Sequence, residues 1–418
     1  MWQPCSTGRR LTVERIRRHP VFGLANKATP IIGVDIGSST IKVAQFKRDK
    51  NGLSLVNFGV VPTPEGSIEE GKIAKGDIIS EALGSLLSLH SFVGKRVSAS
   101  VSGQLVTVKQ VTVDEIPRQP LGDIVKWEME KHISYPIEEA VFDYQVLSRS
   151  QTDDGGVKAN CLVAAAPLDI VNGLMGVIRK TQLEPVFIEV EPFAELRLVD
   201  YVSYKRPDLD AKTIVMVNIG STITSINVAD QSMIRLTRMI PFGGARISQA
   251  IASALGINTE RAEELKQESV NVNPDANLEA NSEAERATSA ALPIIDELVL
   301  EIRRSLNYYT TRFESDRPLH LILSGGTANL KGIADYVELS TGFTVELNRL
   351  LLDVAKYDPS MFAESYLNEM APMFSVATGL SLREFEAAAA RKHSGRHQAK
   401  PVSVGESLLT YRPGSEGL

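Results

Sequence analysis

The stretch Ile31-Ile32-Gly33-Val34-Asp35-Ile36-Gly37-Ser38-Ser39-Thr40-Ile41-Lys42 decides the fold of this chain. Its apolar first half predicts a buried strand, and the small residues that follow predict a turn into a second strand. Such a turn leaves backbone N–H groups available to an anion, and glycine lets a phosphate approach closely. Asp35 offers a carboxylate to a phosphate-bound Mg²⁺, and Lys42 offers a cation to the phosphates. The plain alternative is a structural hairpin with a solvated Asp35.

A second copy of this pattern favours the phosphate interpretation. Val34-Asp35-Ile36-Gly37-Ser38 corresponds to Val217-Asn218-Ile219-Gly220-Ser221. Each copy continues into two further strand-like runs, at 42–46 and 53–61 in the first and at 224–229 and 232–240 in the second. The repeat predicts two similar halves that face each other. A third glycine loop, within 321–330, follows an apolar strand and precedes a helical stretch.

Composition and charge narrow the function classes. Lys and Arg total 45 against 51 Asp and Glu, a net charge of -6 that argues against nucleic acid as the main partner. The two cysteines, Cys5 and Cys161, lie far apart, which favours a reducing cytoplasm over a disulfide-bonded secreted protein. No apolar run reaches the ~20 residues that span a bilayer. Scattered histidines argue against a transition-metal centre, and the missing Gly-Lys-Ser/Thr sequence argues against a P-loop motor.

The spacing of apolar residues predicts the remaining elements. Strands are expected at 96–101 and 106–113, and a hairpin at 141–149 and 158–166 around a polar turn. Helices are expected at 67–90, 122–133, 168–181, 245–255, from an N-cap at Thr259, at 293–312 and at 374–386. The polar segment 271–288 is predicted to be a loop.

Two phosphate hairpins followed by a strand-Ser-Gly-Gly-helix loop resemble the actin, Hsp70 and sugar-kinase superfamily, whose members clamp a nucleotide between two lobes. The run 127–144, from Trp127 to Tyr144, is similar to the type IV pilus assembly PilM family, a relative of FtsA. The resemblance implies an α/β, actin-like (ribonuclease H-like) two-lobe fold with duplicated β-β-β-α-β-α units. It also implies an inserted FtsA-type 1C subdomain.

The resemblance predicts how the chain divides. Lobe 1 (subdomain 1A) is expected at 30–104, 186–210 and 374–386, with the inserted subdomain 1C at 105–185. Lobe 2 is expected to combine a base (subdomain 2A) at 211–243 and 319–373 with subdomain 2B at 244–318. The basic extension 1–29 and the tail 387–418 are predicted to be disordered.

The resemblance also implies ATP and Mg²⁺ as ligands. It assigns Asp35 to Mg²⁺ through a water molecule, and it assigns the hairpin N–H groups and Lys42 to phosphates. Glu263 and Lys266, spaced i,i+3, match the pair that contacts the ribose in relatives; a surface ion pair is the alternative. The predicted nucleotide-binding residues are Asp35, Gly37, Ser38, Ser39, Thr40, Lys42, Asn218, Gly220, Ser221, Thr222, Glu263, Lys266, Gly325 and Gly326.

One departure from the superfamily concerns hydrolysis. Asn218 stands where active ATPases and kinases usually carry aspartate, and a neutral amide can neither accept a proton as a base nor add charge beside Mg²⁺. We therefore expect nucleotide binding with weak or no ATPase activity. Glu189 and Glu191, near the connection between lobes, either orient a hydrolytic water or are structural acids.

The expected partner is the cytoplasmic N-terminal peptide of the inner-membrane pilus protein PilN, held in a crevice beside the unit at 105–185. Indirect partners are PilO and the pilus motor complex; homo-oligomerisation stays open. The expected location is the cytoplasmic face of the inner membrane.

Two alternatives remain. The first is an FtsA-like filament protein of cell division, although the tail 391–418 lacks an apolar face. The second is a small-molecule kinase, against which Asn218 and the inserted unit both argue.

Overall fold

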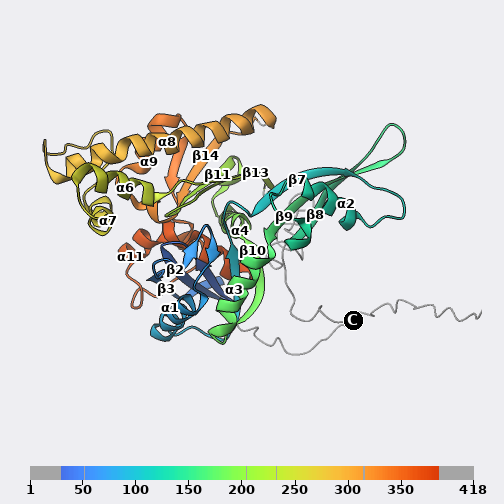
Figure 1. The fold of residues 1–418 in the computed structure, drawn as a ribbon, viewed down its shortest axis with the longest axis horizontal. Coiled ribbons are helices and arrows are strands. Elements are labelled where there is room, and N and C mark those ends of the chain that lie inside the picture. Colours follow the sequence, from blue (N-terminus) through green and yellow to red (C-terminus); the bar gives the residue numbers. More distant parts are fainter. Residues whose placement is uncertain (1–29, 51, 204, 232, 314–315, 386–418) are drawn as a thin grey trace, which may run out of the picture.

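A computed structural model describes residues 30–385, apart from 51, 204, 232, 314 and 315. Within them the chain forms two lobes and a projecting third unit, seen at the bottom, top and right of Figure 1. The predictions made for 1–29 and 387–418 fall outside the described residues. Each lobe is built around one five-stranded sheet, and the third unit around a three-stranded sheet.

The sheet of lobe 1 is centred on the stretch that opens with Ile32. Strand β1 (Ile32–Ile36) pairs antiparallel with β2 (Thr40–Asp49), which pairs antiparallel with β3 (Gly52–Pro62). On the other side of β1 the strands run parallel to it: β6 (Arg96–Val101) and then β10 (Glu184–Val190). The order is therefore β10-β6-β1-β2-β3, with Ile32 and Val34 fully buried at its centre.

The sheet of lobe 2 repeats this topology. Its antiparallel part is β11 (Thr213–Ile219), β12 (Thr224–Asp230) and β13 (Met233–Ile240), and its parallel part is β14 (Leu319–Ser324) and β15 (Thr344–Leu347). The order β13-β12-β11-β14-β15 matches lobe 1 strand for strand. The duplication predicted from the two hairpin motifs is confirmed.

The third unit, called the insert below, interrupts lobe 1 between its neighbouring strands β6 and β10. It contains β7 (Thr107–Asp114), α2 (Leu121–Glu130), the short 3₁₀ helix η1 (Ile137–Glu139), β8 (Ala140–Gln151), β9 (Val157–Pro167) and α3 (Leu168–Lys180). Its sheet has the order β7-β9-β8. Along β9 the side chains alternate: Cys161 and Val163 pack with α2, whereas Leu162 and Ala164 pack toward the lobes.

The insert contacts both lobes. Helix α3 lies in the core of lobe 1, where Leu174 and Ile178 pack with Leu83 of α1 (Gly76–Leu89). The same apolar cluster takes in Ile234 of β13, and the Gln110 side-chain amide donates to the Ile234 carbonyl oxygen at 2.7 Å. The sheet of the insert therefore meets the sheet of lobe 2 along their edge strands, β7 and β13. Because lobe 1 depends on α3, the whole of 105–185 is not a removable unit.

Two helices, α4 (Glu191–Ser203) and α12 (Ser375–Ser381), pack together between the lobes. A Cβ atom at Gly379 of α12 would lie 1.9 Å from the carbonyl oxygen of Ala194 in α4, so only glycine permits this spacing. On its other side α12 lies against β1, and the Ser381 hydroxyl donates to the Ile31 carbonyl oxygen at 3.1 Å. The C-terminal end of the described chain thus completes lobe 1.

The structure corrects three predicted elements and one predicted helix cap. The helix expected from residue 67 begins only at α1 (Gly76–Leu89), because Glu70 and Gly71, both with positive φ, form the turn of a small hairpin before it. This hairpin consists of β4 (Ile68–Glu69) and β5 (Lys72–Ile73). The helix expected at 374–386 is broken into η3 (Ala371–Phe374), α12 and η4 (Leu382–Phe385).

The third correction concerns the predicted loop at 271–288. Its end belongs to α8 (Glu283–Arg312), which Ser282 caps by accepting from the N–H of Glu285 at 3.1 Å. Ser-x-x-Glu is a capping-box pattern, and Pro293, taken as the helix start, lies inside the helix. Thr259 is not the cap of α7 (Thr259–Glu268), because Asn258 is. The other helices are α5 (Pro207–Asp210), α6 (Gly244–Leu255), η2 (Gly326–Asn329), α9 (Ile333–Thr341), α10 (Leu350–Val354) and α11 (Glu364–Met370).

Candidate nucleotide-binding site

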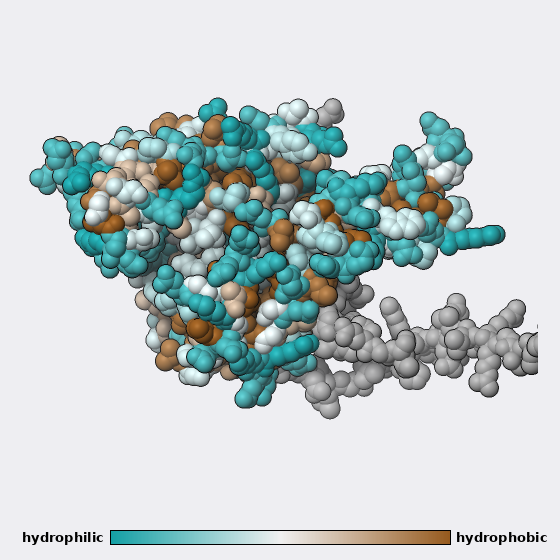
Figure 2. Space-filling model, viewed as in Figure 1, coloured by the Kyte–Doolittle hydropathy of each residue, from teal (hydrophilic) through white to brown (hydrophobic). Residues whose placement is uncertain are grey.

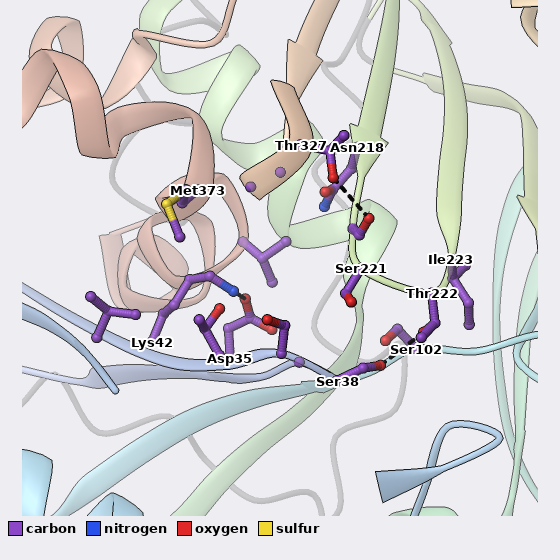
Figure 3. A pocket seen from close by; sticks show the side chains of 18 of the residues that line it. Asp35, Ser38, Lys42, Ser102, Asn218, Ser221, Thr222, Ile223, Thr327 and Met373 are labelled. Atoms are coloured by element: carbon purple, nitrogen blue, oxygen red, sulfur yellow. Dashed lines mark hydrogen bonds and ion pairs between the residues drawn. The ribbon is translucent and has the colours of Figure 1, made fainter. Parts of the chain in front are cut away.

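A cavity of about 840 Å³ lies between the lobes, and it brings together the predicted residues of both repeats. Figure 3 shows that residues of both hairpins, labelled there, face one another across it. All the sequence-predicted residues line this cavity: Asp35, Gly37, Ser38, Ser39, Thr40, Lys42, Asn218, Gly220, Ser221, Thr222, Glu263, Lys266, Gly325 and Gly326.

The first hairpin supplies a charged pair and free amides. Asp35 and Lys42 are cross-strand partners, and the Lys42 ammonium lies 3.1 Å from an Asp35 carboxylate oxygen. The turn closes through the N–H of Gly37 and the carbonyl oxygen of Thr40 at 3.0 Å. Within the described residues the N–H groups of Ser38 and Ser39 have no protein acceptor. Free amides of this kind suit the oxygens of a phosphate.

The second hairpin has the same geometry. The N–H of Gly220 donates to the carbonyl oxygen of Ile223 at 3.0 Å, as Gly37 does in the first. The N–H groups of Ser221 and Thr222 likewise find no acceptor among the described residues. The hydroxyls of Ser38 and Thr222 lie 2.9 Å apart, so the two hairpins touch (Figure 3). The four residues that carry these amides therefore lie together at one end of the cavity.

Glu263 and Lys266 form an ion pair in which the lysine is buried and the glutamate is half-buried, so it is not an ordinary surface pair. The Lys266 ammonium is held by Glu263 at 2.6 Å, Ser248 at 3.1 Å and the carbonyl oxygen of Gly244 at 3.2 Å, and its residue is only 7% exposed. These bonds use all three ammonium donors. Lys266 consequently fixes the Glu263 carboxylate, and of the two it is Glu263 that is open to a ribose hydroxyl.

Gly325 occupies a position that no other residue could take without strain. Its φ is +86°, and a Cβ atom there would lie 2.4 Å from the Ile219 carbonyl oxygen and 2.5 Å from Asn218 Oδ1. The backbone at Gly325 therefore lies in close contact with the end of β11. Gly326 comes next, where a Cβ atom would meet only the end of Met373 at 3.9 Å. The glycine pair leaves a floor of bare backbone for a ligand.

The two acids near the lobe connection have different places. Glu189 is buried and bound to Arg197 at 2.5 Å, which makes it a structural acid. Glu191 lines the cavity and accepts from the Asn218 amide at 2.6 Å. Burial, and then the charges of Glu195 and Asp35, raise the pKa of Glu191. Glu191 therefore stays protonated further toward neutral pH than an ordinary glutamate.

Glu195, one turn along α4, escaped the sequence analysis. It is fully buried, and burial raises its pKa against the opposing effect of its hydrogen bonds. Its carboxylate accepts from Ser324 at 3.1 Å, Asn227 at 3.0 Å and Ser375 at 3.2 Å, which joins β14 and β12 of lobe 2 to α12. Its i,i+4 spacing from Glu191 was the signal available in the sequence.

The residues fit a nucleotide with Mg²⁺. Mg²⁺ bound to phosphates needs only one or two protein carboxylates and keeps several waters, and Asp35 lies beside the hairpin amides. Within the part of the chain that the structure describes, no cluster of three or more His, Cys, Asp or Glu is arranged to hold a metal ion by itself.

Comparison with known proteins identifies the family. The family described as "Type IV pilus assembly protein PilM" matches residues 33–385. The chain belongs to the PilM family. A solved structure of a PilM-PilN type IV pilus biogenesis complex is similar at a TM-score of 0.73 and 26% identity, over 85% of this chain and 98% of that one. The actin-like two-lobe fold expected from the sequence is confirmed.

Other similar proteins place the PilM fold more broadly. Cell division protein FtsA of Bacillus subtilis (strain 168) is 22% identical over 387 residues, which cover 84% of this PilM-family chain and 82% of FtsA. The ethanolamine utilization protein EutJ from Carboxydothermus hydrogenoformans has a TM-score of 0.50 at 15% identity, covering 84% of this chain and 89% of EutJ, a likeness of fold alone. Among the described residues, no helix has both the length and the apolar character needed to cross a membrane.

Proposed function

We propose that this PilM-family chain is an ATP-binding scaffold of the type IV pilus assembly platform, and that it binds the N-terminal cytoplasmic peptide of PilN. The observation that carries the nucleotide part is the meeting of Ser38 and Thr222 at 2.9 Å, which puts four free hairpin amides at one end of the cavity. Asp35 and Lys42 lie at the same end, and the glycine pair extends the floor beyond it.

The chemistry favours binding over turnover. A general base must be ionised at the working pH, yet Glu191, the acid of α4 that lines the cavity, has a raised pKa and accepts a hydrogen bond from the Asn218 amide. Lys42 and the amides bind phosphate in either case. On this proposal a bound nucleotide fixes the position of one lobe relative to the other. Partners then bind to the lobes in that fixed arrangement.

Melting with and without Mg²⁺ and ATP tests nucleotide binding. A ligand at 100 times its Kd stabilises the folded protein by about 2.7 kcal/mol, so the melting temperature rises. Lys42→Ala should abolish the rise. Lys180→Ala is the matched control, because Lys180 also pairs with an aspartate, Asp77, but on the surface. If ATP, ADP and GTP all leave the unaltered protein's melting temperature unchanged, the nucleotide proposal is wrong.

The partner part of the proposal is supported by the similar solved structure, which is a complex of PilM with PilN. The insert also offers suitable surface: β8 is an edge strand, and its sheet stands against lobe 1 through α3. In the view of Figure 2 the projecting tip is hydrophilic, while hydrophobic residues gather where the insert meets the rest of the molecule. An extended peptide pairs with strand edges and places side chains in neighbouring apolar pockets. On this proposal the partner brings the chain to the cytoplasmic face of the inner membrane.

Point variants test the peptide site without removing α3. Leu168, 43% exposed, lies where the insert joins lobe 1, whereas Trp127, 57% exposed, lies on α2 at the opposite face of the insert. Fluorescence anisotropy with a labelled peptide of the PilN N-terminus should show binding to the unaltered chain and to Trp127→Glu. Leu168→Glu should weaken binding at least tenfold. Undiminished affinity in Leu168→Glu would place the peptide elsewhere.

A further inference from the structure

Helix α4 faces the sheet of lobe 2 with a stripe of residues whose two halves differ in chemistry. The stripe, on one face of the helix, consists of Glu191, Glu195, Leu198 and Val202. Its apolar half packs in one cluster with Met216 of β11 and Ile322 of β14. Asn218 and Ser324 follow two positions later on the same face of those strands, and they meet the acidic half. The helix therefore contacts the sheet through apolar packing at one end and through hydrogen bonds at the other.

Glu195 is the centre of the hydrogen-bonded half. It is fully buried, and its carboxylate accepts from Asn227 of β12 at 3.0 Å, Ser324 of β14 at 3.1 Å and Ser375 of α12 at 3.2 Å. Strand β11, which lies between β12 and β14 in the sheet, is held by Glu191. Glu195 therefore connects two strands of lobe 2 with a helix that lies against β1 of lobe 1.

Stability alone does not explain a carboxylate at this position. Burying a carboxylate is costly even when it is hydrogen-bonded, and well-packed apolar side chains of similar volume are often as stabilising. Hydrogen bonds add direction, because each donor must meet the carboxylate within a narrow range of distance and angle, whereas apolar attraction is non-directional. The polar half of the stripe therefore specifies where lobe 2 sits on α4, and the apolar half stabilises the contact.

The elements that Glu195 connects carry the two hairpins. The second hairpin joins β11 to β12, and Glu195 bonds to β12 directly. The first hairpin joins β1 to β2, and α12, to which Glu195 also bonds, lies against both strands. We propose that Glu195 is a positioning residue of the nucleotide site: it holds the lobes where Ser38 and Thr222 meet, so that both hairpins can contact one polyphosphate. The proposal rests on the nucleotide-binding function proposed above.

The surroundings of Asn227 permit an exchange test. Its amide nitrogen donates to Glu195, and its Oδ1 is buried without a hydrogen-bond partner within the described residues. Asn227→Asp sets a second carboxylate against Glu195, and the two repel each other. Adding Glu195→Gln restores the pair with its roles exchanged, because the glutamine amide can donate to the new carboxylate. Oε1 of the glutamine can still accept from Ser324 and Ser375, which bond to Oε1 of Glu195.

A distance between the lobes reports their position directly. Spin labels at Glu81→Cys of α1 and Asn307→Cys of α8, both exposed positions, are measured by double electron–electron resonance, with Cys5→Ser to prevent labelling there. Without nucleotide, the chain that carries only these three changes should give one narrow distribution. Glu195→Ala and Asn227→Asp should each broaden or shift it. The double variant Glu195→Gln/Asn227→Asp should restore it.

Affinity for ATP with Mg²⁺, measured by isothermal titration calorimetry, is the second readout. If only about one chain in ten holds the hairpins in position, the apparent affinity falls about tenfold. We expect this loss for Glu195→Ala and Asn227→Asp, and recovery in the double variant. Gln45→Ala is the matched control: Gln45 is also fully buried and makes three hydrogen bonds, but with Pro30 and Val93 inside lobe 1. It should lower stability and leave distance and affinity unchanged.

Three results would overturn the positioning role. One is a distance and an affinity that Glu195→Ala leaves unchanged. Another is equal broadening in Gln45→Ala, which would reflect a general loss of stability. The third is an Asn227→Asp variant that Glu195→Gln does not rescue. If the unaltered chain binds no nucleotide at all, the proposed function fails instead, and the distance measurement still decides whether Glu195 positions the lobes.

Discussion

The Ser38 and Thr222 hydroxyls lie 2.9 Å apart although 184 residues separate them in the chain. They stand at the tips of the two equivalent hairpins, one from each lobe. The contact is exposed and uncharged, so it adds little to the stability of the folded chain. It marks the place where the lobes would have to part slightly for a phosphate to enter between the amides.

The first prediction uses this contact as a reporter of phosphate. In a double-mutant cycle of Ser38→Ala and Thr222→Ala, urea unfolding without nucleotide should give a coupling energy of about 0.5–1 kcal/mol. With saturating Mg²⁺ and ATP the coupling should fall to zero, because phosphate oxygens replace the partner hydroxyl. A coupling that persists unchanged with ATP would show that the hairpins do not open to admit a phosphate.

The second prediction concerns Asn218, whose amide donates to Glu191 at 2.6 Å. Asn218→Asp removes that donor and sets a third carboxylate beside Glu191 and Glu195, so we expect a loss of about 1–3 kcal/mol in the free energy of unfolding. Because it would lie beside Glu191 and Glu195, the carboxyl group of the new aspartate would stay protonated and would not act as a base near pH 7. Hydrolysis should stay far below the ~10 s⁻¹ of typical enzymes.

Asn307→Asp, at an exposed position of α8, is the control for the added charge. A variant Asn218→Asp that is as stable as the unaltered protein, or that hydrolyses ATP briskly, would show that the Glu191 surroundings do not hold a proton.

The third prediction is a pH dependence of stability. Burial raises the pKa values of Glu191 and Glu195 in the folded state above that of an unfolded glutamate, about 4.3. In this pH range the folded chain binds more protons at these two glutamates than the unfolded chain does. Their contribution to the free energy of unfolding is therefore fully present below about pH 4, and it is lost as the pH rises toward the folded pKa values. Urea unfolding between about pH 5 and 8 should show this decline, and Glu191→Gln should flatten it.

Glu81→Gln, which alters an exposed glutamate of α1, serves as the matched control and should leave the slope unchanged. A slope identical in Glu191→Gln and the unaltered protein would mean that Glu191 does not titrate in this range.

The fourth prediction concerns the contact between the crossing helices. Gly379→Ala would force a methyl group to within 1.9 Å of the Ala194 carbonyl oxygen, so α12 must move away from α4. We expect a loss of about 1–3 kcal/mol in the free energy of unfolding, the usual cost of overpacking a core. Gly84→Ala in α1, where a Cβ atom meets nothing within 4 Å, should instead be stabilising by ~0.5–1 kcal/mol. Equal effects of the two substitutions would contradict the packing described.

The sequence predicted what local pattern encodes. Both hairpins and the Gly325 loop were found because turn residues at fixed offsets between apolar strands determine the backbone there. Pro293 was misleading, since proline usually marks the first turn of a helix and here lies beyond a capping box. The buried Glu195 was missed because its state depends on three hydrogen-bond donors that come from distant parts of the chain. No single stretch of sequence records such partners.

The packing of α12 against β1 also sets the order in which the two lobes fold during synthesis on the ribosome. Ser381 bonds to Ile31 across 350 residues, which take about 20–70 s to synthesise at roughly 5–20 residues per second. Lobe 2, whose strands all fall within 213–347, is complete before α12 is made. Nascent chains arrested before Ser375 emerges should resist protease in lobe 2 and be cut in lobe 1; protection of lobe 1 in such chains would disprove this order. Lobe 1, whose first strands are translated first, is therefore the last part of the molecule to complete its fold.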